Sequence, residues 1–159
     1  MSFARWLEHL PWVVELTGDA VQISIVWLFH FLGFFLAVGT TAILDLRVLG
    51  LAGRRLTIGQ LAKQFSPWTW VGLVLAAVSG FLMFAGYAVQ EYPAPIFRAK
   101  VLLFFIAILF GYLVQRNASK WDRFPSAPAG AKLLALCSLL LWIGVILISV
   151  EVPAFIACI

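Results

Sequence analysis

The side chain with the clearest chemical potential is His30, which lies inside the uncharged run from Val21 to Leu44. Along a helix, its distance from Val21 is roughly 14 Å, close to the middle of a membrane span. An ionisable side chain at that depth is costly and marks a candidate functional site. Three roles for His30 stay open: a structural imidazole that hydrogen-bonds a neighbouring helix, an axial ligand of haem b or a metal ion, and a proton relay or substrate contact.

Small residues accompany His30 on its own helical face and recur in a second apolar run. Such small-residue stripes allow a second helix, or a flat cofactor such as haem b, to approach the backbone closely. In the haem interpretation, Met83 is the sixth ligand that this chain offers. The candidate cofactor-binding residues are therefore those of the two stripes, with His30 also the candidate metal ligand: His30, Gly33, Ala37, Gly72, Ala76, Ser79 and Met83.

Four further polar residues lie on or near the apolar runs: Thr41, Asp45, Arg47 and Lys100. We expect Asp45 and Arg47 to cap and pin the end of the first span, with gating or substrate binding as the alternative. Lys100 lies at the start of the third span, where a long side chain reaches the headgroups or pairs with Glu91. Together the four residues would be polar stations if the protein carried a solute.

The composition identifies the environment of these residues. Apolar residues make up 64% of the 159 residues, charged residues make up 11%, and the mean hydropathy is +1.04. A soluble domain has about 25% charged residues, so these values exclude a water-soluble enzyme and a disordered chain. The 11 basic residues are too dispersed for a nucleic-acid-binding surface, despite the net charge of +4. No catalytic motif is evident, and we assign no catalytic residue.

Four runs are long and apolar enough to cross a bilayer, and they read as residues 21–44, 68–89, 95–115 and 133–150. We therefore predict one all-α domain over residues 1–159, an integral membrane bundle of four antiparallel transmembrane helices. An amphipathic helix ending at Pro11 is expected to lie on the membrane surface before the first span. A second short helix is expected to begin with the capping box at Thr57 and to stop at Pro67.

The charges predict the orientation. Most basic residues lie in the two loops that follow the first and third spans. The positive-inside rule places these loops in the cytoplasm, and both chain termini on the periplasmic side. The lipid bilayer is one predicted partner, and other copies or subunits of a membrane complex are the others. No nucleic-acid partner is expected.

The motifs His30-Phe-Leu-Gly33 and Asp45-Leu-Arg-Val-Leu-Gly50 resemble those of an uncharacterised bacterial four-helix inner-membrane family, a domain of unknown function. Pro67-Trp68 before the second span, and Phe97 with Lys100 in the third, extend the resemblance over most of the chain. It implies a multi-pass bundle in the bacterial inner membrane but no activity. The family is loosely similar to copper-resistance D-type and b-type cytochrome membrane bundles, which bind haem or handle metal through intramembrane histidines.

Three functions follow as hypotheses. The first is a binding or accessory membrane subunit. The second is a haem b-binding electron-transfer component that uses His30. The third is a carrier or channel for a small solute or metal.

Overall fold

The computed structural model describes the backbone of residues 2–52 and 55–157, and the side chains of residues 3–52 and 55–150. Within these ranges the regular structure is entirely helical, as predicted. Four of the helices are long and apolar enough to cross a membrane, which confirms a multi-pass membrane protein. The helices, in chain order, are α1 (Ser2–Glu8), α2 (Pro11–Gly18), α3 (Ala20–Leu49), α4 (Ile58–Gly86), α5 (Ala88–Glu91), α6 (Pro95–Trp121) and α7 (Ala129–Ala157).

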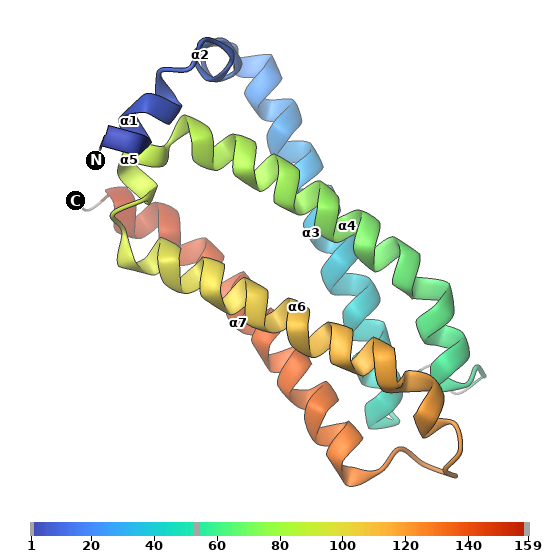
Figure 1. Cartoon of the computed structure of the whole chain (residues 1–159). Helices are drawn as coiled ribbons and strands as arrows, with labels where there is room; N and C mark the ends of the chain where they lie inside the picture. The colour runs from blue at the N-terminus through green and yellow to red at the C-terminus, as the bar shows by residue number, and fades with distance from the viewer. Residues whose placement is uncertain (1, 53–54, 158–159) are drawn as a thin grey trace.

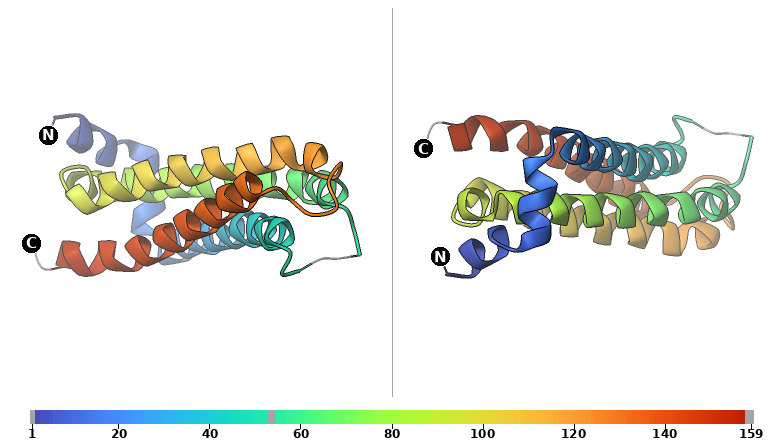
Figure 2. Two further views of the ribbon diagram at one scale, coloured as in Figure 1. Left: turned by 90° about the horizontal axis from the view of Figure 1, so that it is seen from below. Right: turned by 90° about the horizontal axis from the view of Figure 1, so that it is seen from above.

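The long helices form two hairpins. Helix α3 packs mainly on α4, and α6 packs mainly on α7. The two hairpins diverge toward the end of the bundle where α5 joins α4 to α6, and the start of α1 and the end of α7 lie at this end (Figures 1 and 2). We call it the α5 end. The opposite end holds the end of α3 and the start of α4.

Close packing between α3 and α4 depends on two glycines. A Cβ on Gly33 would lie 2.7 Å from the backbone nitrogen of Ala76, and a Cβ on Gly72 would lie 2.6 Å from that of Ala37. Real Cβ atoms do not approach so closely, so only glycine permits this separation between the two backbones. Interhelical packing of small residues takes the place of the hydrophobic effect in a bilayer, where lipid tails are as apolar as leucine.

Local sequence signals end α3 and begin α4 at the opposite end of the bundle. Gly50 has φ 83°, and the backbone N–H groups of Gly50 and Leu51 donate to the carbonyls of Arg47 and Leu46. This left-handed cap ends α3. The predicted capping box at Thr57 begins α4, with Gln60 as its partner, and this prediction is confirmed.

The prediction that Pro67 stops a short helix is wrong, because α4 runs unbroken from Ile58 to Gly86 with Pro67 inside it. Proline removes one backbone N–H and so leaves the carbonyl of Lys63 without its helical partner. Lys63 is exposed near the end of the bundle, where water or headgroups can satisfy that carbonyl. The helix therefore continues through the proline.

The N-terminal region also differs from expectation. Pro11 begins α2 rather than only ending the helix before it, since proline suits the first turn of a helix. Ala4 and Leu7 of α1 are buried against Val13, Ala85 and Ala88. The backbone N–H of Val89 donates to the Glu8 carboxylate at 2.7 Å. Helix α1 is thus held against α5, and its place on the membrane surface stays a prediction.

Candidate functional site

A cavity of about 410 Å³ opens between the two hairpins at the α5 end. Most of its wall is apolar and aromatic, and its polar groups come from four different helices. We call it the His30 cavity. Its lining residues are His30, Phe34, Ala76, Ala77, Gly80, Phe81, Met83, Phe84, Glu91, Phe97, Lys100, Val101, Phe104, Phe105, Val145 and Ser149.

The imidazole of His30 is fixed by α4. Its Nδ1 lies 3.1 Å from the carbonyl oxygen of Ala76 and 3.2 Å from the hydroxyl oxygen of Ser79. The Ser79 proton is already donated to the carbonyl of Leu75 at 2.6 Å. Both partners of Nδ1 therefore act as acceptors, so Nδ1 carries the proton and donates it. Nε2 then holds a lone pair, and no described residue hydrogen-bonds to it.

A glycine makes room for this ring. A Cβ on Gly80 would lie 3.1 Å from Cε1 of His30 and 3.4 Å from Nδ1. A side chain at position 80 would press on the imidazole edge that faces α4. The ring can therefore sit against the backbone of α4 while His30 still lines the cavity.

Lys100 and Glu91 add two opposite charges to the cavity wall. The Nζ of Lys100 lies 5.2 Å from the centre of the Phe97 ring, a cation–π distance. Burial raises the pKa of Glu91 in α5, and the positive charge of Lys100 partly opposes this rise. The expected interaction of Lys100 with Glu91 is thus electrostatic, and no ion pair within contact distance joins them in the described part of the chain.

The stripe residues divide between this cavity and the helix contact. His30, Ala76 and Met83 line the cavity, and Ser79 supports His30. Gly33, Ala37 and Gly72 instead lie where the backbones of α3 and α4 touch. These three residues serve helix packing, and at Gly33 and Gly72 not even a Cβ would fit between the two backbones.

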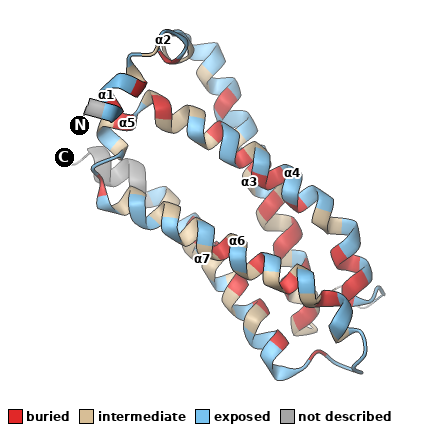
Figure 3. Ribbon diagram, viewed as in Figure 1, coloured by how far each residue is buried: buried red, intermediate tan, exposed pale blue. Residues whose placement is uncertain are grey.

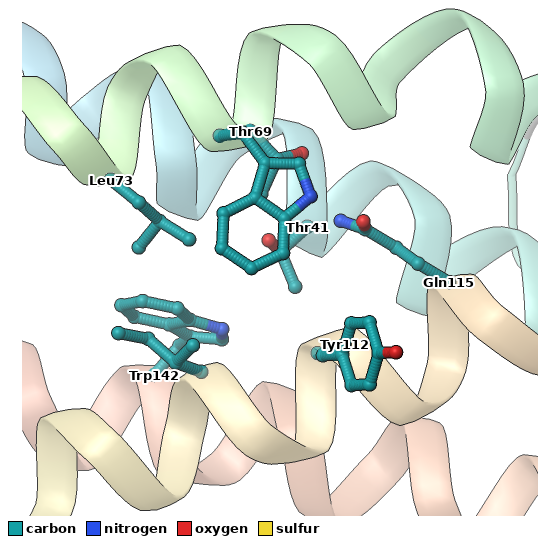
Figure 4. Close-up of a pocket in the computed structure, with 9 residues that line it drawn as sticks. Thr41, Thr69, Leu73, Tyr112, Gln115 and Trp142 are labelled. Atoms are coloured by element: carbon teal, nitrogen blue, oxygen red, sulfur yellow. The ribbon is translucent and has the colours of Figure 1, made fainter.

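A second, much smaller pocket of about 10 Å³ lies farther from the α5 end. Figure 4 shows Thr41, Thr69, Gln115 and Trp142 around it, one from each long helix. The hydroxyls of Thr69 and Thr40 lie 2.8 Å apart, and Thr41 donates to the carbonyl of Ala37. We call this the Trp142 pocket.

Asp45 does not cap α3 as expected, because Gly50 does so. Its side chain instead points into the bundle, is fully buried, and faces Ser138 of α7. The two groups are neighbours, but neither the Asp45 oxygens nor the Ser138 hydroxyl makes a hydrogen bond of acceptable geometry to a protein group. Arg47 points elsewhere, and its Nε donates to the carbonyl of Leu56 at 3.0 Å.

Aromatic rings separate the two polar regions. The Trp142 ring lies 6.2 Å from Phe34 and 5.9 Å from Phe104, edge to face in both pairs. Phe34 and Phe104 line the His30 cavity, whereas Trp142 lines the smaller pocket. His30 and Lys100 are therefore on one side of these rings, and Thr41 and Asp45 are on the other.

Sequence reasoning did not select Ser138, Trp142 or Ser149 as site residues. Ser138, Trp142, Val145 and Ser149 form one stripe at helical spacing on α7. That spacing was the available signal, but it fits ordinary helix packing equally well.

The described residues contain no group of three or more His, Cys, Asp or Glu side chains that could hold a metal ion. A family model, the family of unknown function DUF6644, matches residues 8–152. The chain belongs to this family. No curated protein and no solved structure matches the chain significantly. The family description assigns no activity.

Proposed function

We propose that this protein is a membrane-embedded binding protein whose His30 cavity takes a lipophilic molecule with a hydroxyl or carbonyl head group. The observation that carries the proposal is the cavity itself. At about 410 Å³ it falls within the roughly 300–1,000 Å³ range typical of small-molecule sites. Its apolar wall with a few convergent polar groups is also typical of such sites.

The polar groups define the head group. Nε2 of His30 is an acceptor, because Nδ1 holds the proton, while the Lys100 ammonium is a donor. Glu91 lies in the same wall, so the cavity does not present an uncompensated positive charge. This arrangement favours a neutral ligand that both donates and accepts over a strongly charged anion. A quinone and its quinol have this chemistry, and the phenylalanines would contact their ring faces.

The test uses a short-chain quinone with the purified protein in mild detergent, and measures binding by calorimetry. Ala77→Phe adds an aromatic ring to the cavity wall and should abolish binding. The control is Leu140→Phe, which places the same aromatic side chain on the exposed surface of α7 outside the cavity. Equal binding by both variants, or no binding by the wild type, would contradict the proposal.

A haem b ligand is the second candidate, and the hydrogen bond at Nδ1 of His30 favours it. Histidines that ligate metals usually donate their other ring N–H to a carbonyl or carboxylate, which fixes the ring and frees the second nitrogen. His30 has this arrangement, and Met83 lies in the same cavity wall. In such a site His30 would bind the iron through Nε2, and the haem would supply electron-transfer chemistry. This candidate agrees with the looser resemblance to b-type cytochromes.

Visible spectra separate the two candidates. A Soret band in the purified wild type that disappears in His30→Ala would support haem ligation. A colourless protein that binds the quinone would support the first proposal alone. A Soret band that persists in His30→Ala would exclude His30 as the ligand.

We also propose that the protein lies in the bacterial inner membrane with the α5 end on the periplasmic side. Support comes from the basic residues Lys63, Arg116, Lys120 and Lys132, which belong to helix segments near the opposite end. Single cysteines can be introduced at exposed Lys132 and exposed Gln90 in a variant without Cys137 and Cys158. An impermeant maleimide added to intact spheroplasts should label position 90 and spare position 132, and the reverse pattern would invert the orientation.

A further inference from the structure

The Asp45 region contains a set of buried polar atoms that the proposed function does not use. Four atoms have neither solvent contact nor a protein hydrogen-bond partner: both carboxyl oxygens of Asp45, the hydroxyl of Ser138 and Nε1 of Trp142. Asp45 and Ser138 are 0% exposed, and Trp142 is 2% exposed. Unsatisfied buried polar groups are rare in native proteins, and several together point to an occupant.

The space for an occupant is beside Gly111 on α6. A Cβ placed on Gly111 would lie 3.8 Å from Nε1 of Trp142 and 3.9 Å from the hydroxyl of Ser138. The unpartnered indole N–H of Trp142 and hydroxyl of Ser138 thus border the volume that a side chain at position 111 would fill. Gly111 also lines the Trp142 pocket, whose volume of about 10 Å³ is close to the minimum for a single water molecule.

The charge of the carboxyl group is the second constraint. Within the described residues, the cations on the helices packed against α3 lie elsewhere. Lys100 lines the His30 cavity, and the others are exposed: Lys63, Arg98, Arg116, Lys120 and Lys132. On its own helix, Arg47 is engaged with the carbonyl of Leu56. An ionised carboxylate without a counter-charge is strongly disfavoured inside an apolar bundle. A bound proton removes the charge and adds an O–H donor.

We propose that Asp45, Ser138 and Trp142 form a proton-binding site in which Asp45 is a neutral carboxylic acid and a water molecule beside Gly111 joins it, through Ser138, to the indole of Trp142. The water accepts a hydrogen bond from the Trp142 N–H and is bonded to the Ser138 hydroxyl. Ser138 in turn is bonded to the Asp45 carboxyl. The Trp142 N–H, the Ser138 hydroxyl and one Asp45 oxygen gain partners in this network. A small cation is the less suitable occupant, because the Trp142 N–H can only donate and would point toward a positive charge.

Infrared spectroscopy of the detergent-solubilised protein tests the site at neutral pH. We expect the carbonyl stretch of a protonated carboxylic acid in the wild type, and its loss in Asp45→Asn. Glu91→Gln is the control, since it removes a half-buried carboxyl group at the α5 end and should leave the Asp45 band in place. If the wild-type minus Asp45→Asn difference shows only carboxylate bands, Asp45 is ionised and the proposal is overturned.

Two further variants test the water link without removing Asp45. Trp142→Phe deletes the N–H donor, and Gly111→Ala fills the space for the water. Each should shift the carboxylic acid band, because the hydrogen bonding of the network changes. An unshifted band in both variants would contradict the network. The melting temperature is also measured in sodium chloride and in choline chloride. If sodium chloride raises the melting temperature of the wild type more than choline chloride does, and Asp45→Asn shows no such difference, the site binds a cation and the proton assignment is overturned.

Discussion

The two ends of the bundle are built from the same four helices but pack differently. At the α5 end, α3 and α4 stand apart from α6 and α7 around a cavity of about 410 Å³, whereas nearer the opposite end the helices close around a pocket of about 10 Å³. Figure 3 shows the same contrast, with more buried residues toward the opposite end. The difference follows from side-chain size along each helix.

Phenylalanines dominate the α5 end, which we call the open end; the opposite end is the closed end. Phe84 of α4 stacks on Phe97 of α6, with ring centres 5.2 Å apart, and this contact holds the hairpins at a distance. The opposite end has small residues where the hairpins meet, including Ala118, Ala131 and Ala135 around Leu44. Small residues let helices approach, and large rings keep them separated. The open end can therefore admit a ligand, while the closed end can hold little more than a proton and a water molecule.

The largest expected effect tests the glycine contact that joins α3 to α4. Gly72→Leu places a side chain where even a Cβ would lie 2.6 Å from the backbone of Ala37. We expect a loss of about 3 kcal/mol in the free energy of unfolding, since overpacking forces the backbones apart. Gly39→Leu is the matched control, because a Cβ there has no neighbour within 4 Å. Equal stability of the two variants in detergent denaturation would show that the contact is not required.

The next effect compares core truncation at the two ends. Leu44→Ala at the closed end removes a side chain that is 1% exposed. In a bilayer, lipid replaces part of the lost burial, so the void accounts for most of an expected cost of about 2 kcal/mol. Phe105→Ala in the cavity wall, where the ring is 62% exposed, should cost less than about 0.5 kcal/mol. A reversed order in chemical denaturation would refute the packing difference.

A smaller effect concerns the contact that closes the opposite end. The Asp122 carboxylate accepts from the Gly59 N–H at 3.0 Å and from the Thr57 hydroxyl at 2.9 Å. A Cβ on Gly59 would lie 2.5 Å from this carboxylate. Gly59→Ala should therefore cost about 1 kcal/mol by breaking a charge-assisted bond at the start of α4. Gly130→Ala, at the same position of α7 and without neighbours, should cost nothing, and a similar loss there would contradict the explanation.

The smallest effect is the pH dependence of the stability that Glu91 contributes at the open end. Burial raises the pKa of Glu91 above its ordinary value of 4.5, so the folded protein holds this proton more tightly than the unfolded chain. Its contribution to stability is therefore greatest at low pH and is lost as the pH rises above 4.5 and through the raised native value. The melting temperature of the wild type relative to Glu91→Gln should fall between pH 4 and pH 8. A difference that is constant over this range would contradict the burial of Glu91.

Much of the fold could be predicted from local patterns. Four apolar runs indicated four spans, because crossing a bilayer depends on the length and hydropathy of a segment. The capping box at Thr57 was also readable, since its residues are close in sequence. Pro67 was misleading: proline ends helices in water, but near the end of a membrane helix its cost depends on what satisfies one carbonyl.

The candidate site could be predicted only in part. His30 stood out because an ionisable residue at mid-membrane is rare, but its partners Ala76 and Ser79 lie on another helix. Asp45 was identified as a candidate polar residue, but the prediction that it caps the helix was wrong. The direction of its side chain depends on the rotation of α3 about its axis, which the sequence does not reveal. Ser138 and Trp142 carried no distinctive signal. The predicted association with other copies or subunits stays a prediction.

By itself, the sequence determined that this protein crosses the membrane and which ionisable side chains it brings into the bilayer. Both properties depend on the order of residues along one helix. The tertiary structure decided where the helices touch and where they separate, because those distances depend on side chains that meet from different helices. In the tertiary structure, the glycines of α3 and α4 form a close helix contact, the phenylalanines of α4 and α6 line a cavity, and Asp45 faces Ser138.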